Sequence, residues 1–122
     1  LTWGDPAWEN VNSALAAGPR LIANGAFAVN PKAEGFDSSG EIWRPTRQIG
    51  IGIDNQNNYV LAMLEFASPE DFARVLLAQG VREAIRLDSG TSAQMVLAGG
   101  AVGGRIGRTV PNAIVFKTRE KN

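Results

Sequence analysis

Gln48-Ile49-Gly50-Ile51-Gly52-Ile53 alternates isoleucine with glycine over most of its length. Alternation with a period of two indicates a β-strand, because successive side chains in a strand point to opposite faces. One face of this strand is apolar, and the other carries almost no side chains. Glycine inside a strand commonly marks the close approach of another backbone or of a ligand. The stretch therefore predicts a strand that is closely approached on its glycine face.

The sequence that follows predicts a hairpin and then a helix. Residues 54–58 form a polar turn, and residues 59–66 form a long apolar strand that pairs with the first one. Ser68-Pro69-Glu70-Asp71 resembles a capping box with proline at the first helical position, with Asp in place of the usual Glu or Gln. An apolar stripe at helical spacing comes next, and Gly80 ends the predicted helix.

The rest of the chain predicts one more helix and several short strands. Asp5-Pro6 has the pattern of a helix start, three apolar residues at helical spacing follow it, and Gly18-Pro19 ends that segment. Short apolar runs predict strands at residues 20–23, 83–87, 93–97 and 113–116. Strands outnumber helices, so we expect one α+β domain in which two helices pack on a mixed, mostly antiparallel β-sheet.

Two long segments carry no regular pattern. Residues 30–47 are polar, and residues 98–111 are rich in glycine. Loops of this length in a small domain are usually functional or mobile. The second loop has neither the Walker spacing nor a G-x-G-x-x-G that opens a helix, so it predicts a flexible hairpin near the site rather than a nucleotide loop. We expect Arg108 in this loop to face an anion.

Two absences limit the chemistry of this 122-residue chain, which contains no cysteine and no histidine. Without a thiol it has no disulfide framework, no cysteine nucleophile and no zinc finger. Without an imidazole it has no Ser-His-Asp triad and no histidine base. Acid–base chemistry near neutral pH would fall to carboxylates, to the one tyrosine or to lysines.

The charge balance indicates the class of partner. Twelve basic and twelve acidic side chains give a net charge of zero, which argues against a general nucleic-acid binder. Nine of the basic residues are arginines, whose planar fork of donors suits carboxylate and phosphate groups. No apolar run reaches the roughly 18 residues of a membrane span, and no signal peptide opens the chain. The chain begins at Leu1, and we expect that it was processed or trimmed.

Residues 86–95, Arg-Leu-Asp-Ser-Gly-Thr-Ser-Ala-Gln-Met, are the sharpest candidate for chemistry. Asp88 stands at the end of an apolar strand, and a tight turn of hydroxyl side chains around Gly90 follows it. Such turns present backbone N–H groups and hydroxyls together, which suits an oxyanion or a phosphate. Asp88 would then be an accessible acid, base or nucleophile. In the plainer alternative, the turn is an Asx-type turn in which Asp88 caps its own backbone.

The five residues Asp-Ser-Gly-Thr-Ser at 88–92 also resemble the active-site turn of aspartic proteases. That chemistry needs a second carboxylate of the same kind, from another lobe or from a dimer mate. The glycine-rich segment after the turn is too short for such a lobe. An aspartic-protease-like hydrolase is therefore the weaker alternative.

Four stretches of the chain carry a more specific pattern. Residues 17–25 combine A-G-P, an apolar pair and N-G, and residues 47–54 place an arginine before the isoleucine–glycine strand and an aspartate after it. Residues 84–92 read A-I-R-L-D-S-G-T-S, and residues 108–115 read R-T-V-P-N-A-I-V. In order and spacing, the four stretches resemble motifs of the phosphodiester glycosidase family over nearly the whole chain.

The resemblance implies a hydrolase-type domain that cleaves a sugar-1-phosphodiester or a related cell-envelope glycan linkage. Its relatives are mostly bacterial and secreted, so it also implies a secreted or periplasmic protein whose partner is a phosphate-bearing glycan or small molecule, without cofactor or metal. By the matched positions, Asp88 acts at the anomeric centre and arginines hold the phosphate. The residues expected to bind substrate and phosphate are Asn24, Arg47, Ser89, Gly90, Thr91, Ser92, Arg108 and Asn112.

Two departures from the family pattern bear on activity. Ser89 takes the place of the first glycine of the acidic turn. The family domain also has an N-terminal portion with an N-x-x-F-F-like segment that is not found ahead of Leu1, so we expect this chain to be the C-terminal part of such a domain. Glycoside cleavage ordinarily uses two carboxyl groups, and only Asp88 is matched.

The second carboxylate has several candidate sources. Glu34, Asp37 and Glu41 are the local ones, on the long polar loop. The missing N-terminal portion and a homodimer mate are the others. Without a second carboxylate, the chain would be a non-catalytic module that binds a glycan or a phosphate in the same cleft.

Overall fold

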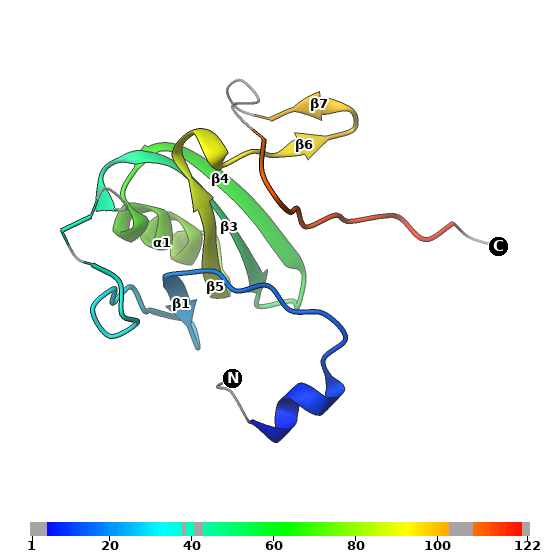
Figure 1. Ribbon diagram of the computed structural model, residues 1–122, viewed down its shortest axis with the longest axis horizontal. Coiled ribbons are helices and arrows are strands. Elements are labelled where there is room, and N and C mark those ends of the chain that lie inside the picture. Colours follow the sequence, from blue (N-terminus) through cyan, green and yellow to red (C-terminus); the bar gives the residue numbers. More distant parts are fainter. Residues whose placement is uncertain (1–4, 38, 41–42, 103–108, 121–122) are drawn as a thin grey trace.

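The centre of the structure is a five-stranded sheet with one helix against it (Figure 1). This computed structural model describes residues 5–37, 39–40, 43–102 and 109–120. In chain order its strands and helix are β1 (Arg20–Ala23), β2 (Ala26–Phe27), β3 (Thr46–Asp54), β4 (Tyr59–Ala67), α1 (Pro69–Ala78), β5 (Val81–Ser89), β6 (Val96–Leu97) and β7 (Gly100–Ala101). Short 3-10 helices lie at Pro6–Asn10 and Gly90–Ser92.

The strand order in the main sheet is β2-β1-β5-β3-β4, and β6 pairs with β7 in a separate ribbon. All pairings among the described strands are antiparallel. The predicted α+β class and the antiparallel sheet are confirmed, but the described chain has one α-helix instead of two. No helix within these residues is long and apolar enough to cross a membrane.

The helix α1 packs on the glycine face of β3. A Cβ atom on Gly50 would lie 3.0 Å from Cε1 of Phe72, whose side chain is fully buried on α1. A Cβ atom on Gly52 would lie 2.6 Å from the carbonyl oxygen of Glu83 and 2.7 Å from Cγ1 of Val81, both on β5. The predicted close approach on this face is confirmed, and it is made by the protein's own helix and strand.

A single hydrophobic core lies between α1 and the sheet. It consists of the buried residues Leu21, Ile22, Phe72, Ala73, Leu76, Val81 and Ala84. Full burial of a large apolar side chain contributes about 1.5–3 kcal/mol.

On the opposite face of the sheet Ile49 is buried, while Ile51 and Ile53 are partly exposed. At the β4 edge the ring of Tyr59 contacts Phe116 of the C-terminal segment, with 5.7 Å between ring centroids.

The capping signal that predicted α1 is confirmed. The Ser68 hydroxyl accepts a hydrogen bond from the backbone N–H of Asp71 at 3.1 Å and donates one to Asp71 Oδ2 at 2.8 Å. The helix ends at Ala78, and the chain leaves it through Gly80 with φ +81°. The local sequence thus determines both ends of this helix.

The helix predicted between Asp5 and Gly18 is wrong. Asp5 does cap the segment, since its Oδ1 accepts from the backbone N–H of Ala7 at 2.9 Å, but only the 3-10 helix follows it. The apolar side chains Trp8 and Leu15 are 36% and 48% exposed, so no face of this segment is buried. A short helix without tertiary packing is marginal in water, which explains the non-helical course of residues 11–19.

Two of the predicted strands also differ from the structure. The strand expected at 93–97 is reduced to β6, and residues 113–116 form no strand and lie exposed. A strand requires hydrogen bonds to a neighbouring strand, and the described sheet offers none to residues 113–116. The observed β5 extends further at both ends than the predicted 83–87, and the short β2 was not predicted.

We expect Gly52→Ala to lower the free energy of unfolding by about 1–3 kcal/mol. The added methyl group would meet the Glu83 backbone, which cannot move without disturbing the pairing of β3 with β5. Urea unfolding followed by circular dichroism measures the effect. Gly100→Ala is the matched control, because the nearest atom to its Cβ would be 3.9 Å away. A Gly52→Ala variant as stable as wild type would contradict the close approach.

Acid should weaken the β3–β4 turn through Asp54. Its pKa is held below the ordinary 3.8, mainly because the Asn58 side chain and backbone donate hydrogen bonds to its carboxylate. A pKa lowered by folding stabilises the protein above pH 3.8, and this contribution is lost as the pH falls through the folded-state value. Asp54→Asn should therefore lose less stability than wild type on acidification.

The measurement is the unfolding free energy at neutral pH and below pH 3.8, with the exposed Glu9→Gln as control. Equal acid sensitivity in wild type and Asp54→Asn would show that this carboxylate does not stabilise the turn.

Candidate functional site

The acidic turn lies at the carboxyl end of β5. Asp88 is exposed, and its Oδ1 accepts a hydrogen bond from the backbone N–H of Ser89 at 2.7 Å. This contact reaches only the next residue, whereas the Asx-type turn of the plainer alternative has a hydrogen bond to the backbone two residues on. Ser89 has an extended backbone, with φ −147°, so the serine causes no strain there. The left-handed position of the turn is Gly90, with φ +62°.

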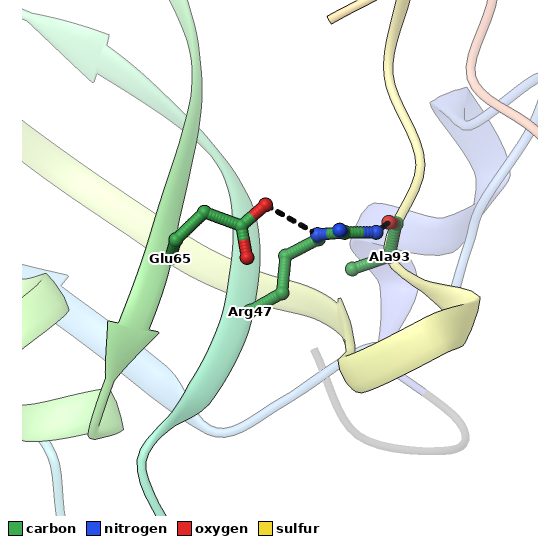
Figure 2. A network of polar contacts seen from close by, with 3 residues as sticks. All are labelled: Arg47, Glu65 and Ala93. Carbon is green, nitrogen blue, oxygen red and sulfur yellow. Dashed lines mark hydrogen bonds and ion pairs between the residues drawn. The ribbon is translucent and has the colours of Figure 1, made fainter. Parts of the chain in front are cut away.

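Arg47 connects β4 to this turn (Figure 2). Its Nε donates to Glu65 Oε1 at 2.7 Å, and its Nη1 donates to the Ala93 carbonyl at 3.3 Å. The side chain of Arg47 is 16% exposed and that of Glu65 is 40% exposed. An ion pair with this exposure contributes at most about 1 kcal/mol to stability. Its effect is to fix where the Glu65 carboxylate stands relative to the turn.

Arg86 and Gln48 are buried polar side chains that are joined by hydrogen bonds at this end of the sheet. The Arg86 side chain is 3% exposed, and its Nε donates to Gln48 Oε1 at 2.7 Å. Gln48 is fully buried, and its Nε2 donates to the Ala67 carbonyl at 2.8 Å. Burial lowers the pKa of Arg86, and the charge of Asp88 opposes that shift. A buried cation thus lies close enough to Asp88 to interact with it.

Two β-bulges flank β3 at this end of the sheet. On the β4 side, Thr46 pairs with Ala67 and Gln48 pairs with Leu64, so two residues of β4 lie opposite one residue of β3. On the β5 side, Gln48 also pairs with Ser89, while the next pair along β3 is Gly50 with Arg86. The residues in the first bulge are Glu65 and Phe66, and those in the second are Leu87 and Asp88. Bulges redirect side chains, and they are frequent next to active sites.

Phe66 is the most unusual residue of the first bulge. It is 86% exposed and has φ +52°, a left-handed conformation that a bulky side chain rarely adopts. The bulge therefore places an aromatic ring on the surface directly after Glu65.

The structure brings together part of the predicted site. Arg47 and the turn residues Asp88 to Ser92 meet at one end of the sheet. Asn24 lies apart from them, beside the start of β5, where its backbone N–H donates to Glu83 Oε1 at 2.8 Å. Asn112 is exposed in the C-terminal segment and lines a shallow hollow with residues 13–15. Arg108 lies outside the described residues.

The loop carboxylates proposed as partners of Asp88 have structural contacts of their own. Both oxygens of Glu34 accept from the backbone N–H of Arg20 at 3.0 Å. Asp37 accepts from the backbone N–H and the hydroxyl of Ser39, which lowers its pKa. Glu41 is not among the described residues. Within the part of the chain that the structure describes, no acidic cluster could hold a metal ion.

Sequence reasoning missed three residues of this site. They are Gln48, Glu65 and Arg86. Gln48 and Arg86 belong to apparently apolar strands, and their pairing depends on the register between β3 and β5. An arginine in the middle of an otherwise apolar strand was the available signal for Arg86, because a charged side chain is almost never fully buried without a partner.

Comparisons with known proteins give a consistent result. A family model described as "Phosphodiester glycosidase" matches residues 1–117. The crystal structure of a hypothetical protein from Synechocystis is similar over 81% of this chain and 19% of that chain, with a TM-score of 0.72 and 28% identity.

The catalytic domain of zebrafish N-acetylglucosamine-1-phosphodiester alpha-N-acetylglucosaminidase, auto-inhibited by its pro-peptide, is also similar. This likeness covers 73% of this chain and 34% of that chain, with a TM-score of 0.63. At 21% identity it shows a shared fold. A search of curated proteins gives no match. The chain thus spans about a fifth and about a third of the two solved chains.

We expect Gln48→Met to lower the free energy of unfolding by about 1–3 kcal/mol, because it leaves the buried Nε of Arg86 without its acceptor. The double variant Gln48→Met/Arg86→Met should regain much of this loss, since it removes both polar partners. Urea unfolding of the single and double variants measures the coupling, with the exposed Gln56→Met as control. Simple additivity of the two substitutions would contradict the buried pairing.

Proposed function

The chain belongs to the phosphodiester glycosidase family, and we propose that its acidic turn takes part in hydrolysing a sugar-1-phosphodiester or a related cell-envelope glycan linkage. The observation that carries the proposal is the position of Asp88. It is an exposed carboxylate at the end of a central strand, close to a buried arginine and next to a turn of hydroxyls. The substrate class rests on the family and on the activity for which the zebrafish relative is named.

Each part of the site has a role in this proposal. Asp88 acts at the anomeric carbon, where its negative charge stabilises the developing oxocarbenium ion. Arg47 binds the phosphate through its guanidinium, whose Nη2 has no acceptor among the described residues. The hydroxyls of Thr91 and Ser92 and the backbone N–H groups of the turn donate to phosphate oxygens. Arg86 and Gln48 form a buried hydrogen-bonded pair on the strands that carry the site.

Other parts of the proposal rest on the family resemblance alone. We propose that the protein is bacterial and acts outside the cytoplasm, in a secreted or periplasmic location. Cell fractionation tests this location. The aspartic-protease-like alternative has no support in the family match.

One observation favours a second candidate function, a non-catalytic module that binds a glycan or a phosphate. One carboxylate oxygen of Asp88 accepts a hydrogen bond from the backbone N–H of Ser89, so this oxygen already has a structural partner. The same arginine and hydroxyl groups would bind a phosphorylated sugar without cleaving it.

Asp88→Asn should lower sugar release by about a hundredfold or more, because it removes the charge that acts at the anomeric centre while retaining the size of the side chain. The assay measures N-acetylglucosamine released from a model phosphodiester by the purified chain. Glu9→Gln, on the exposed 3-10 helix, is the control and should keep full activity. Circular dichroism verifies that both variants are folded.

Two results would count against catalysis. Full activity of Asp88→Asn would remove this residue from the mechanism. Saturable binding of a sugar phosphate that Arg47→Ala weakens, without turnover of any substrate in a panel of sugar phosphodiesters, would establish the binding module instead.

A further inference from the structure

We propose that Glu65 is the second carboxyl group of this site and acts with Asp88 on opposite sides of the bound substrate. This role deepens the proposed function and rests on it. Glu65 belongs to no motif of the sequence, and with it both carboxyl groups lie within the described part of this chain.

Glu65 and Asp88 hold corresponding positions on the sheet. They occupy the two bulges on either side of β3, and Gln48 of β3 pairs with both flanking strands between them. Neighbouring strands lie about 4.8 Å apart, so β4 and β5 are separated by roughly 10 Å. Both carboxylates stand at the same end of the sheet, where β4 and β5 finish. The spacing leaves room for a scissile bond between them.

The Glu65 carboxylate is held by one oxygen and open at the other. Arg47 Nε binds its Oε1 at 2.7 Å, while its Oε2 has no hydrogen-bond donor among the described residues. Since Arg47 also donates to the Ala93 carbonyl, the same guanidinium fixes Glu65 and the turn that carries Asp88 (Figure 2). Glu65 is 40% exposed, so its second oxygen is accessible to water or substrate. Asp88 likewise has one oxygen that accepts a hydrogen bond, and its Oδ2 has no donor among the described residues.

The other local carboxylates are occupied elsewhere. Both oxygens of Glu34 accept a backbone hydrogen bond, and Asp37 caps its own turn. Neither lies in a bulge beside β3. Of the described carboxylates, Glu65 and Asp88 are the two that lie in the bulges at this end of β3.

Together the two carboxyl groups can hydrolyse the bond between the anomeric carbon and the phosphate oxygen. The Glu65 carboxylate accepts a proton from water as the water oxygen bonds to the anomeric carbon, while the negative charge of Asp88 stabilises the developing oxocarbenium ion. The bond from that carbon to the phosphate oxygen breaks, and its electron pair leaves on the phosphate. Arg47 binds the charge that forms on the leaving phosphate, and Glu65 releases its proton to solvent when the products leave. The products are the free sugar and a phosphomonoester.

The test compares Glu65→Gln with wild type on the model phosphodiester used for Asp88→Asn. Glutamine retains an oxygen that can accept from Arg47, so the network and the thermal midpoint should be preserved. We expect kcat to fall by about a hundredfold or more with KM little changed. Glu65→Ala should be equally inactive and should regain activity when formate or azide is added, because a small anion can replace a missing catalytic carboxylate but not a structural one.

A binding measurement separates failure of this inference from failure of the proposed function. The carboxyl carbons of Glu65 and Asp88 are followed by NMR as N-acetylglucosamine-1-phosphate is added to the wild-type chain. Movement of both signals supports the pair. Movement of Asp88 alone, or wild-type kcat in Glu65→Gln, overturns the role of Glu65 and leaves the proposed site standing. Movement of neither, without turnover by wild type, overturns the proposed function and this inference with it.

Discussion

The close packing of Phe72 against the glycine face of β3 is the contact on which the other features depend. Because Gly50 and Gly52 have no side chains, Phe72 of α1 and residues of β5 both come within van der Waals distance of β3. The helix covers one face of the sheet, and the hydrophobic core lies between the helix and that face. Beyond the glycines, β3 reaches the end of the sheet that carries Arg47 and the acidic turn. The site forms there, at the boundary between a rigid core and the surface.

A buried polar chain joins that core to the site. Gln48 lies in the row of β3 that carries the two glycines, and it connects the Ala67 carbonyl of β4 to Arg86 of β5. A charged side chain in this position is costly to bury, and the cost is offset because its donor is paired and Asp88 supplies an opposite charge. The hydrogen bonds of Gln48 therefore join side chains and backbone of three strands directly below the site end of the sheet.

The sequence predicts those parts of the structure that depend on local chemistry. The capping box of α1, the hairpin after β3 and the close approach to its glycine face are all confirmed. The prediction of an N-terminal helix is wrong because the apolar side chains of that segment do not pack on the sheet. The prediction of a strand at 113–116 is wrong because no described strand pairs with these residues. Asp88 and Arg47 could be proposed from motifs. Glu65 could not, since its relation to Asp88 arises from two bulges whose register depends on strands far apart in the chain.

The left-handed backbone of Phe66 lowers the stability of the protein at this position. A left-handed conformation costs a residue with a side chain roughly 1–2 kcal/mol compared with glycine. The ring is 86% exposed, so it recovers almost nothing by burial. Glycine at position 66 would therefore stabilise the fold, since it would remove this backbone cost and lose almost no buried surface. The backbone of Phe66 therefore lowers the stability of the end of β4, while its exposed ring remains available at the surface.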